Sequence, residues 1–363
     1  MNKEILIGIH KAIHDKVDPE LEVYRKILIH NNINYIDLDS SDPDFWKKIR
    51  QATHFIYKWS HGHSDHQIAH AVIPIIQYQL QLKCFPNWET SWHYDDKIKQ
   101  AYLLEENGFP ICESYIFFNK KKAQQWLERT ELPVVFKLKS GSGSMNVQLI
   151  FSKSHAKHMI NKMFGKGIHQ DRNGLLKTMK TFNFNSVKIF RYYGIKLRNL
   201  LIGKDTTSFW QKQKNYVLFQ KFMPKNDYDT RVQITGKRAF AYLRYNRPND
   251  FRASGSNNWS LDHKTIDMEM VKIAFNVSQK LGFQSMAYDF IYDHDGKPGI
   301  VEMSYCFGDY PEFSNGYWQE NLEWIPGRFL PQYFELMDLL GLPDLKLPDH
   351  ITAASSYRKV KIP

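Results

Sequence analysis

The first 82 residues alternate between short apolar segments and longer segments with helical spacing, and this alternation narrows the possible folds more than anything else in the sequence. Strands that alternate with helices assemble into a parallel sheet with helices on its faces. We therefore expect an N-terminal α/β domain. The CFPN sequence at residues 84–87 interrupts the pattern, and we place the boundary near residue 93. The predicted strands are residues 4–9, 33–38 and 53–59, and the predicted helices are residues 18–31, 42–49 and 67–82.

Beyond this boundary the strands are mostly arranged as hairpins, and fewer helices separate them. Helices at 96–107 and 267–281 should end at Gly108 and Gly282, because glycine is the usual residue just past a helix C-terminus. A hairpin should turn at Gly236. Further predicted strands are 112–118, 133–138, 147–151, 187–193, 216–222, 230–235, 237–245, 286–292 and 299–304, with helices from about residue 121 and at 330–340.

Composition excludes several classes of protein. The 363 residues are 42% hydrophobic and 15% aromatic, which excludes a disordered chain. Three cysteines cannot build a disulfide framework, and no CxxC pair for a zinc ribbon is present. The N-terminus lacks the pattern of a secretory signal, and no apolar run reaches the roughly 18 residues of a membrane span. We expect a cytoplasmic protein without a membrane span.

The formal charge of +11 is concentrated in one segment. Residues 151–216 contain fourteen Lys and Arg but only two acids, whereas the remainder of the chain is nearly neutral. One basic segment on a neutral body favours a local anion site over a nucleic-acid-binding surface, so we do not expect a nucleic-acid partner. A solvated basic face is the alternative for part of this segment.

The sequence KSGSGSMNV at residues 139–147 lies between two predicted strands. Glycines at positions 141 and 143 permit the close backbone approach and unusual dihedrals that a phosphate cradle requires. No GKS or GKT follows, which excludes a Walker A loop, and a strand rather than a helix follows, which excludes the dinucleotide fingerprint. A flexible hairpin loop is the alternative.

Two acidic residues are predicted to face each other in the hairpin formed by MAYDFIY and GIVEMSY. A turn centred on Asp295-Gly296 places Asp289 directly opposite Glu302. Like charges in opposed positions destabilise a sheet, and a divalent cation would relieve the repulsion because hard cations prefer carboxylate oxygens. Ser304 lies on the same face. The pair therefore predicts a magnesium site, and a solvent-exposed face is the alternative.

The order of these motifs resembles the ATP-grasp superfamily, with the carboxylate–amine ligases (α-L-glutamate ligases and glutathione synthetases) the best match. The resemblance covers roughly residues 84–330. In order, the motifs are FPN, Asp95-Asp96-Lys97, a helix ending in GFP, VVFK at 134–137, SGSGS at 140–144, QKFMP at 220–224, DTR at 229–231, and YDF with VEMSY.

The resemblance implies a nucleotide site. Lys97 and Lys137 would hold phosphates of ATP. In the hinge at residues 220–223, which includes Lys221, the Gln220 carbonyl would accept from the adenine amine and the Met223 N–H would donate to the ring. Asp227 would meet the ribose. The loop closing over the β- and γ-phosphates would be Ser140, Gly141, Ser142, Gly143 and Ser144.

The resemblance also implies a reaction centre. Arg231 and Arg244 would meet the transferred phosphoryl group or the acyl-phosphate. Two Mg²⁺ ions would be held by Asp289, Glu302 and Ser304, although the family usually has Asn at the last position. Arg252 in NDFRASGS is a candidate for binding the substrate carboxylate, because a guanidinium matches a carboxylate bidentately. Surface ion pairing is the alternative for each arginine.

Together these features predict an N-terminal pre-ATP-grasp domain and two ATP-grasp lobes. The predicted boundaries are 1–93 for the first domain, 94–219 for the small lobe, 220–340 for the large lobe and 341–363 for a tail. The implied activity is an ATP-dependent ligase joining a small-molecule, peptide or sugar carboxylate to an amine through an acyl-phosphate. Two alternatives remain, namely an ATP-grasp kinase and a non-catalytic module that binds an anionic polymer.

The HGHSDHQIAH sequence places His61, His63, His66 and His70 close together. The spacing of His66 and His70 is possible for zinc, but no HExxH motif or cysteine partner is present. Substrate contact is the better functional interpretation, because the loop leaves a predicted parallel strand at its carboxyl end, where ligands of open sheets bind.

Overall fold

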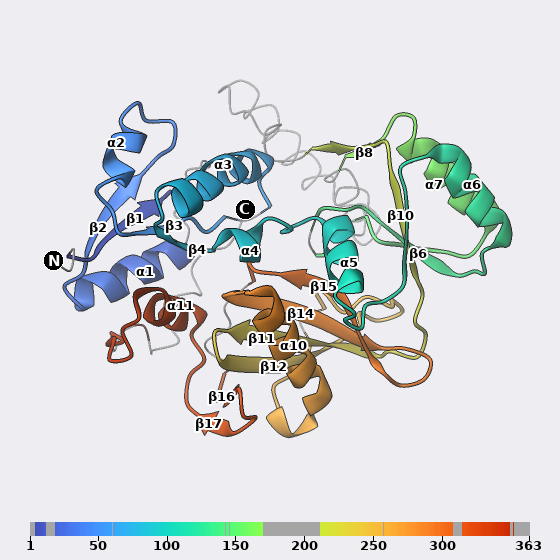
Figure 1. The fold of residues 1–363 in the computed structure, drawn as a ribbon. Helices are drawn as coiled ribbons and strands as arrows, with labels where there is room; N and C mark the ends of the chain where they lie inside the picture. Colours follow the sequence, from blue (N-terminus) through green and yellow to red (C-terminus); the bar gives the residue numbers. More distant parts are fainter. Residues whose placement is uncertain are drawn as a thin grey trace, which may run out of the picture.

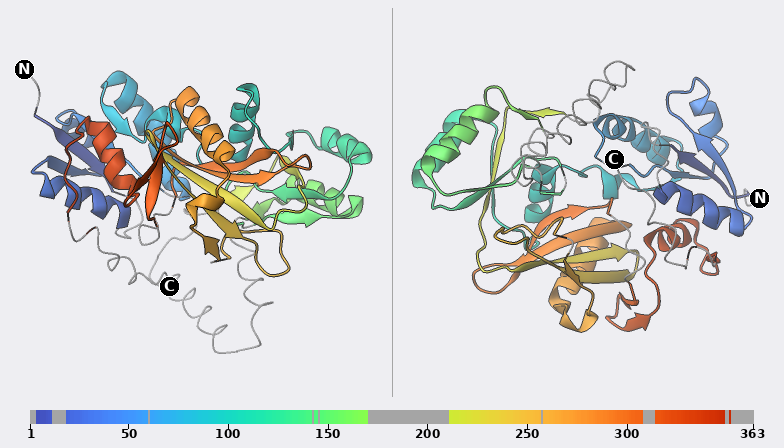
Figure 2. Two further views of the ribbon diagram at one scale, coloured as in Figure 1. Left: turned by 90° about the horizontal axis from the view of Figure 1, so that it is seen from below. Right: turned by 180° about the vertical axis from the view of Figure 1, so that it is seen from behind.

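The computed structural model describes residues 4–11, 19–59, 61–141, 143–144, 146–169, 211–256, 258–307, 314–348 and 351. Ser142, the predicted strand at 187–193 and the centre of the basic segment lie outside these ranges. Within them, the three larger sheets form an N-terminal body, a small lobe and a larger antiparallel body, and a fourth sheet has two short strands (Figures 1 and 2). No helix in the described part of the chain is long and apolar enough to cross a bilayer.

The N-terminal sheet is parallel, as the alternation predicts, and its strand order is β2-β1-β3-β4. Its fourth strand, Lys83–Phe85, was missed, because the sequence around CFPN was taken only as a break in the pattern. The remaining strands are β1 (Leu6–His10), β2 (Asn34–Leu38) and β3 (His54–Ile56). The helices are α1 (Pro19–His30), α2 (Phe45–Ile49), α3 (His63–Pro74) and the π-helix η1 (Ile75–Gln79).

Helix α11 (Pro331–Leu340) returns to this first body and lies beside α1 (Figure 1). Its buried Leu336 and Leu339 share a hydrophobic core with Ile27 and Leu28 of α1. An ion cluster also joins the two helices, because the buried Lys58 Nζ lies 2.7 Å from Glu20 Oε2 of α1 and 3.4 Å from Glu335 Oε2 of α11. The end of the chain therefore completes the core of its first domain.

Helix α5 (Lys97–Glu106) connects the first body to the small lobe, after the short α4 (Trp88–Ser91). Its N-cap is Asp96, whose carboxylate accepts from the Ile98 and Lys99 N–H groups, so its position is set by the DDK sequence. Asn107 caps its C-terminus, and the predicted glycine, Gly108, follows with φ of 71°. The start of α5 therefore has a fixed orientation at the junction of the two bodies.

The small lobe is an antiparallel sheet of order β5-β10-β6-β7 covered by two helices. Its core contains Phe136, Phe219 and Met159, one from each of two strands and one helix. The elements are β5 (Ser114–Phe117), α6 (Lys120–Arg129), β6 (Val134–Lys137), β7 (Gln148–Ile150), α7 (Lys153–Met163), β8 (Ile168–His169), β9 (Lys212–Gln213) and β10 (Val217–Lys221). Helix α7 opens the basic segment.

The large lobe is an antiparallel sheet of order β15-β14-β11-β12-β16-β17, with β13 paired to β12. Its core is continuous with part of the first body, since Tyr57 and Trp59 belong to the same cluster as Tyr288 and Phe290. The elements are β11 (Tyr228–Thr235), β12 (Arg238–Tyr245), β13 (Trp259–Ser260), η2 (His263–Thr265), α10 (Met268–Leu281), β14 (Ser285–Tyr292), β15 (Pro298–Ser304), β16 (Gly316–Gln319) and β17 (Trp324–Pro326).

The predicted pairing of Asp289 with Glu302 is confirmed in the β14–β15 hairpin. The route to it differs from the prediction. Near the turn Phe290 pairs with Ile300, and Val301 is an extra residue that shifts the register before Glu302. The bulge places both carboxylates on one face, whereas an unbroken register would turn Glu302 to the other face.

Candidate functional site

A cleft of about 560 Å³ lies between the small and large lobes. Its walls come from β6, β10 and the glycine-rich loop on one side, and from β11, β12, β14 and β15 on the other. Ser140 does not line it, and Ser142 is outside the described residues. The predicted site residues that line it are Lys97, Lys137, Gly141, Gly143, Ser144, Gln220, Lys221, Met223, Asp227, Arg231, Arg244, Arg252, Asp289, Glu302 and Ser304.

An alternating cluster of arginines and aspartates forms the large-lobe wall. Arg231 Nε and Nη2 donate to the two carboxylate oxygens of Asp289 at 2.7 and 2.9 Å. Arg244 donates bidentately to Asp229 at 2.6 and 2.7 Å, and its Nη2 is also 2.7 Å from Asp289 Oδ2. Strand register creates this pattern, because Asp229 pairs with Arg244 and Arg231 pairs with Asp289 across β12, β11 and β14.

Electrostatics in this cluster keeps Asp289 ionised. Burial by itself would raise the pKa of its carboxyl, but Arg231 and Arg244 outweigh burial and hold that pKa well below the ordinary value. For Asp229 burial dominates, so its pKa is raised despite the contact with Arg244. The negative charge of the cluster therefore resides on Asp289 first.

Asp229 is a residue that the sequence reasoning missed. It lies two positions before Arg231 in β11, and residues two apart in a strand share a face. Its side chain lines the cleft beside Arg231. The signal was therefore present in the DTR sequence, once β11 and β12 were paired through Gly236.

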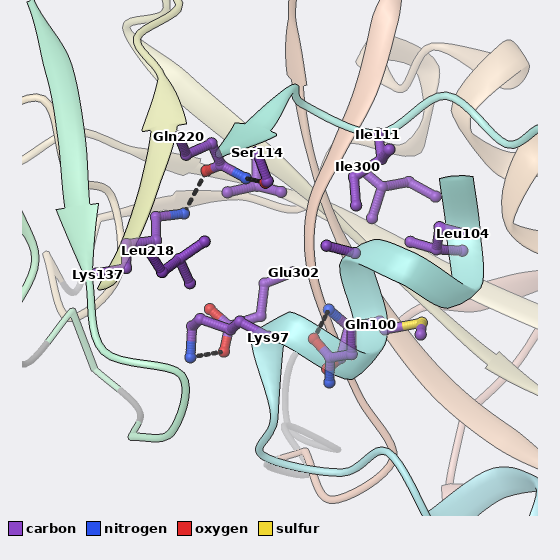
Figure 3. A pocket seen from close by; sticks show the side chains of 13 residues that line it. Lys97, Gln100, Leu104, Ile111, Ser114, Lys137, Leu218, Gln220, Ile300 and Glu302 are labelled. Carbon is purple, nitrogen blue, oxygen red and sulfur yellow. Dashed lines mark hydrogen bonds and ion pairs between the residues drawn. The ribbon is translucent and has the colours of Figure 1, made fainter. Parts of the chain in front are cut away.

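Glu302 has a different environment from Asp289. Figure 3 shows its contact with Lys97, in which Glu302 Oε1 is 2.9 Å from Lys97 Nζ. The Glu302 side chain is 33% exposed. Across the cleft, Lys137 Nζ donates to the side-chain oxygen of Gln220 at 2.5 Å. Each acid of the opposed pair is thus matched by its own cations, which offsets the repulsion that the sequence predicts.

Burial separates the two lysines electrostatically. Desolvation lowers the pKa of Lys137 from 10.5 to about 8, because its nearest acid, Glu302, only partly compensates and Lys97 repels it. Desolvation also acts on Lys97, but Glu302 and Asp95 outweigh it and raise the pKa of Lys97. Lys97 is therefore a fixed cation, whereas Lys137 can titrate near neutral pH.

The start of the glycine-rich loop is hydrogen-bonded to residues at the N-terminus of α5. The Gly141 N–H donates to Asp95 Oδ1 at 2.7 Å, and the Gly141 carbonyl accepts from Lys97 Nζ at 2.9 Å. Gly141 and Gly143 have φ of 114° and 63°, which only glycine adopts readily. Ser140 instead accepts from Gln213 Nε2 at 2.7 Å, which explains why its side chain is not in the cleft wall.

The hinge segment runs from the end of β10 into β11 along one end of the cleft. Met223 and Asp227 both line the cleft there. Asn226 fixes the segment, because its Nδ2 donates to the Met223 carbonyl at 3.3 Å and to the Tyr292 carbonyl at 2.9 Å. The Lys221 ammonium lies 3.6 Å from Glu113 Oε2 at the rim.

Arg252 lines the cleft but already has acidic and carbonyl partners. Its Nε donates to Asp250 Oδ1 at 2.8 Å, and its Nη1 donates to the Val147 carbonyl at 3.2 Å. It thereby joins the loop after β12 to the end of the glycine-rich loop. The ion pair given as the alternative in the sequence analysis is present, and it coexists with exposure to the cleft.

The acidic groups suit a hard cation by their donor chemistry. Three donors contact Asp289, which leaves one of the roughly four acceptor positions of its carboxylate. Glu302 has one such contact and three remaining positions. The Ser304 hydroxyl donates to the Cys306 carbonyl at 2.7 Å, so its oxygen keeps lone pairs for a cation. Asp289, Glu302 and Ser304 therefore fit Mg²⁺.

The histidine segment reaches the cleft through one residue. His61 lines it, and His61 Nδ1 is 3.2 Å from Asp95 Oδ1. His66 Nε2 is 3.8 Å from Asp95 Oδ2, and the ring centroids of His66 and His70 are 6.1 Å apart. Among the described residues, these side chains do not bring three metal-ligating atoms together.

No protein-family model and no curated protein matches the chain. Its structure is similar to that of the D-cycloserine synthetase DcsG, with a TM-score of 0.52 and 14% identity, over 85% of this chain and 94% of that one. It is also similar to the biotin carboxylase–β,γ-ATP complex from Campylobacter jejuni, with a TM-score of 0.50 and 10% identity, over 84% and 66% of the two chains.

A third similar structure is the biotin carboxylase domain of the 2-oxoglutarate carboxylase from Hydrogenobacter thermophilus, in complex with MgADP, ADP and bicarbonate. Its TM-score is 0.50 and its identity 11%, over 85% of this chain and 65% of that one. These similarities and the arrangement of the three sheets show the ATP-grasp fold, which confirms the fold expected from the motifs. At these identities they show the fold alone.

Proposed function

We propose that this protein is an ATP-dependent carboxylate–amine ligase that activates its carboxylate as an acyl-phosphate. The observation that carries the proposal is the convergence of an opposed acid pair, two lysines and two arginines in one cleft beneath a glycine-rich loop. Such a site can hold a triphosphate and stabilise charge as it develops during phosphoryl transfer.

The nucleotide would bind at the small-lobe wall. Lys97 and Lys137 would hold its phosphates, and residues 140–144 would cover them. The adenine would contact the hinge at Gln220 to Met223, with the ribose near Asp227. The proposal is supported by the finding that Lys97, Lys137, Met223 and Asp227 all line the same cleft.

Asp289, Glu302 and Ser304 would hold two Mg²⁺ ions, which neutralise the charge of the phosphates when bound. Arg231 and Arg244 would contact the transferred phosphoryl group, and Arg252 would contact the substrate carboxylate. In the free protein these arginines are held by Asp289, Asp229 and Asp250. Their guanidinium planes are therefore positioned before substrate binds.

The test is ADP release with ATP, Mg²⁺ and panels of amino acids, dipeptides and sugar acids, each with and without an amine. We expect ADP release that requires both partners, with one amide and one phosphate formed per ADP. Glu302→Gln should abolish turnover while the protein remains folded, because its side chain is partly exposed.

Absence of both ATP binding and turnover in every panel would refute the proposal. A stable phosphorylated product, formed without an amine and without free phosphate, would instead assign the site to a kinase. Retention on polyanions without any ATP binding would favour the non-catalytic module.

A further inference from the structure

His61 lies where the first body meets the glycine-rich loop. It follows β3 at the carboxyl edge of the N-terminal parallel sheet, and its ring lines the cleft. The ring nitrogen that approaches Asp95 is Nδ1, which is buried, and this contact leaves Nε2 as the nitrogen that can serve a ligand in the cleft. The side chain is 22% exposed.

Asp95 is built to hold this ring. Its backbone has φ of 51°, in the left-handed region that few residues other than glycine adopt, although Asp tolerates it. Its carboxylate is buried, with Oδ1 bound to the Gly141 N–H at 2.7 Å and 3.2 Å from His61 Nδ1. One carboxylate therefore positions both the imidazole and the start of the glycine-rich loop.

His61 is the histidine of this cluster that lines the cleft. Burial lowers the pKa of His66 to about 4, so the second ring near Asp95 is neutral at neutral pH. Burial would raise the pKa of Asp95, but His61, Lys97 and the Gly141 N–H outweigh it, and this pKa is lowered. The Tyr94 ring packs against the His61 ring, with the two ring centroids 5.5 Å apart.

The proposed ligase chemistry requires a proton acceptor. An amine substrate has a pKa of about 8 or above and is mostly protonated at neutral pH, yet only its unprotonated form attacks a carbonyl carbon. Among the described residues of the cleft wall, the carboxylates of Asp229, Asp289 and Glu302 are bound to arginine or lysine. Asp227 lies at the hinge, which leaves His61 on the side of the first body.

We propose that His61 is the general base of the ligase, with Asp95 as its positioning residue; this inference rests on the proposed function. His61 Nε2 takes one proton from the ammonium group. The amine nitrogen then bonds to the acyl carbon, and the bond from that carbon to the phosphate oxygen breaks. Phosphate leaves with that electron pair and the second nitrogen proton, giving the amide and hydrogen phosphate.

Hydroxylamine as the nucleophile distinguishes a general base from a residue that only binds substrate or supports the fold. It is unprotonated at neutral pH, so it attacks an acyl-phosphate without a base and gives a hydroxamate. The experiment compares wild type, His61→Gln and the matched control His63→Gln, whose side chain does not line the cleft. Each is assayed with ATP, Mg²⁺ and the accepted carboxylate, with either the natural-type amine or hydroxylamine as nucleophile.

We expect His61→Gln to lose amide formation by about 10²- to 10⁴-fold, the usual contribution of a general base, and to keep hydroxamate formation within about threefold. His63→Gln should match wild type with both nucleophiles. In His61→Ala, added imidazole should restore part of the amide rate, because the free base can enter the space of the missing ring.

Equal loss of both products in His61→Gln, without imidazole rescue in His61→Ala, would assign His61 to binding or folding and overturn the proposal. Full amide formation in His61→Gln would overturn it as well. If wild type forms no hydroxamate with any carboxylate, the acyl-phosphate route itself is refuted, and the role of His61 is refuted with it.

Discussion

The titration of Lys137 gives a quantitative test of the nucleotide site. Its pKa of about 8 in the free protein is a consequence of burial, and a bound phosphate raises it again. Phosphate therefore binds the protonated form. The affinity for phosphate is therefore constant at pH values well below 8 and falls as the pH rises through 8. It stops falling above the pKa that Lys137 has in the complex.

The size of the effect follows from the protonated fraction. This fraction falls from about nine tenths at pH 7 to about one tenth at pH 9, so Kd should rise about tenfold, equivalent to about 1.4 kcal/mol. ADP with Mg²⁺ is a suitable ligand, because its own phosphates are fully ionised over this range. Isothermal titration calorimetry at constant ionic strength measures Kd at each pH.

Variants assign the slope to one residue. In Lys137→Gln the dependence should disappear, and its Kd should approach that of wild type at high pH, where the wild-type lysine is also neutral. Lys139→Gln changes a more exposed lysine on the same segment and should retain the slope. A constant wild-type Kd between pH 7 and pH 9, or a slope that persists in Lys137→Gln, would refute the reasoning.

Three further substitutions test other parts of the structure. Asp289→Asn should lower the free energy of unfolding by about 3–5 kcal/mol, because the buried Arg244 and the half-buried Arg231 lose their shared anion. Glu302→Gln should change it by less than about 1 kcal/mol. Urea denaturation compares the two variants, and equal effects would contradict this reasoning. Gly236→Ala should lower the free energy of unfolding by at least about 1 kcal/mol in the same assay. Its φ is +56°, and the new methyl group would overlap the Asp338 carboxylate. An unchanged urea midpoint would contradict this reading of the turn. Lys58→Met should lower the free energy of unfolding by about 3–5 kcal/mol at pH 7, because the buried Glu335 and the half-buried Glu20 lose their shared cation. Urea denaturation measures this change, and a loss below about 1 kcal/mol would contradict it.

The sequence specified the acid pair more securely than it specified the hairpin. Asp289 does face Glu302, but the predicted turn is displaced by one residue and the bulge at Val301 corrects for it. Nothing in the apolar GIVEMSY sequence distinguishes a bulge from a regular strand, because both retain the alternation on each side. The predicted pairing is therefore correct because the displaced turn and the bulge shift the register by one residue in opposite directions.

Long-range partners were the least predictable part of the site. Residue types and spacing identified Arg231 and Arg244, but their clamps on Asp289 and Asp229 depend on which strands become neighbours in the sheet. Likewise, the contact between Asp95 and His61 joins two bodies whose docking has no local sequence signal. The local motifs therefore predict which residue types form the site, whereas the ion pairs between those residues depend on the topology of the sheets.

The packing of α11 against α1 has a consequence for how the protein is made. The core around Ile27 and Leu28 includes Leu336 and Leu339, more than 300 residues later in the chain. During translation, part of the apolar core of the N-terminal domain stays uncovered until α11 has been synthesised, although domains usually fold in the order of synthesis. A fragment limited to residues 1–93 would carry every strand of that sheet and still expose this face to aggregation.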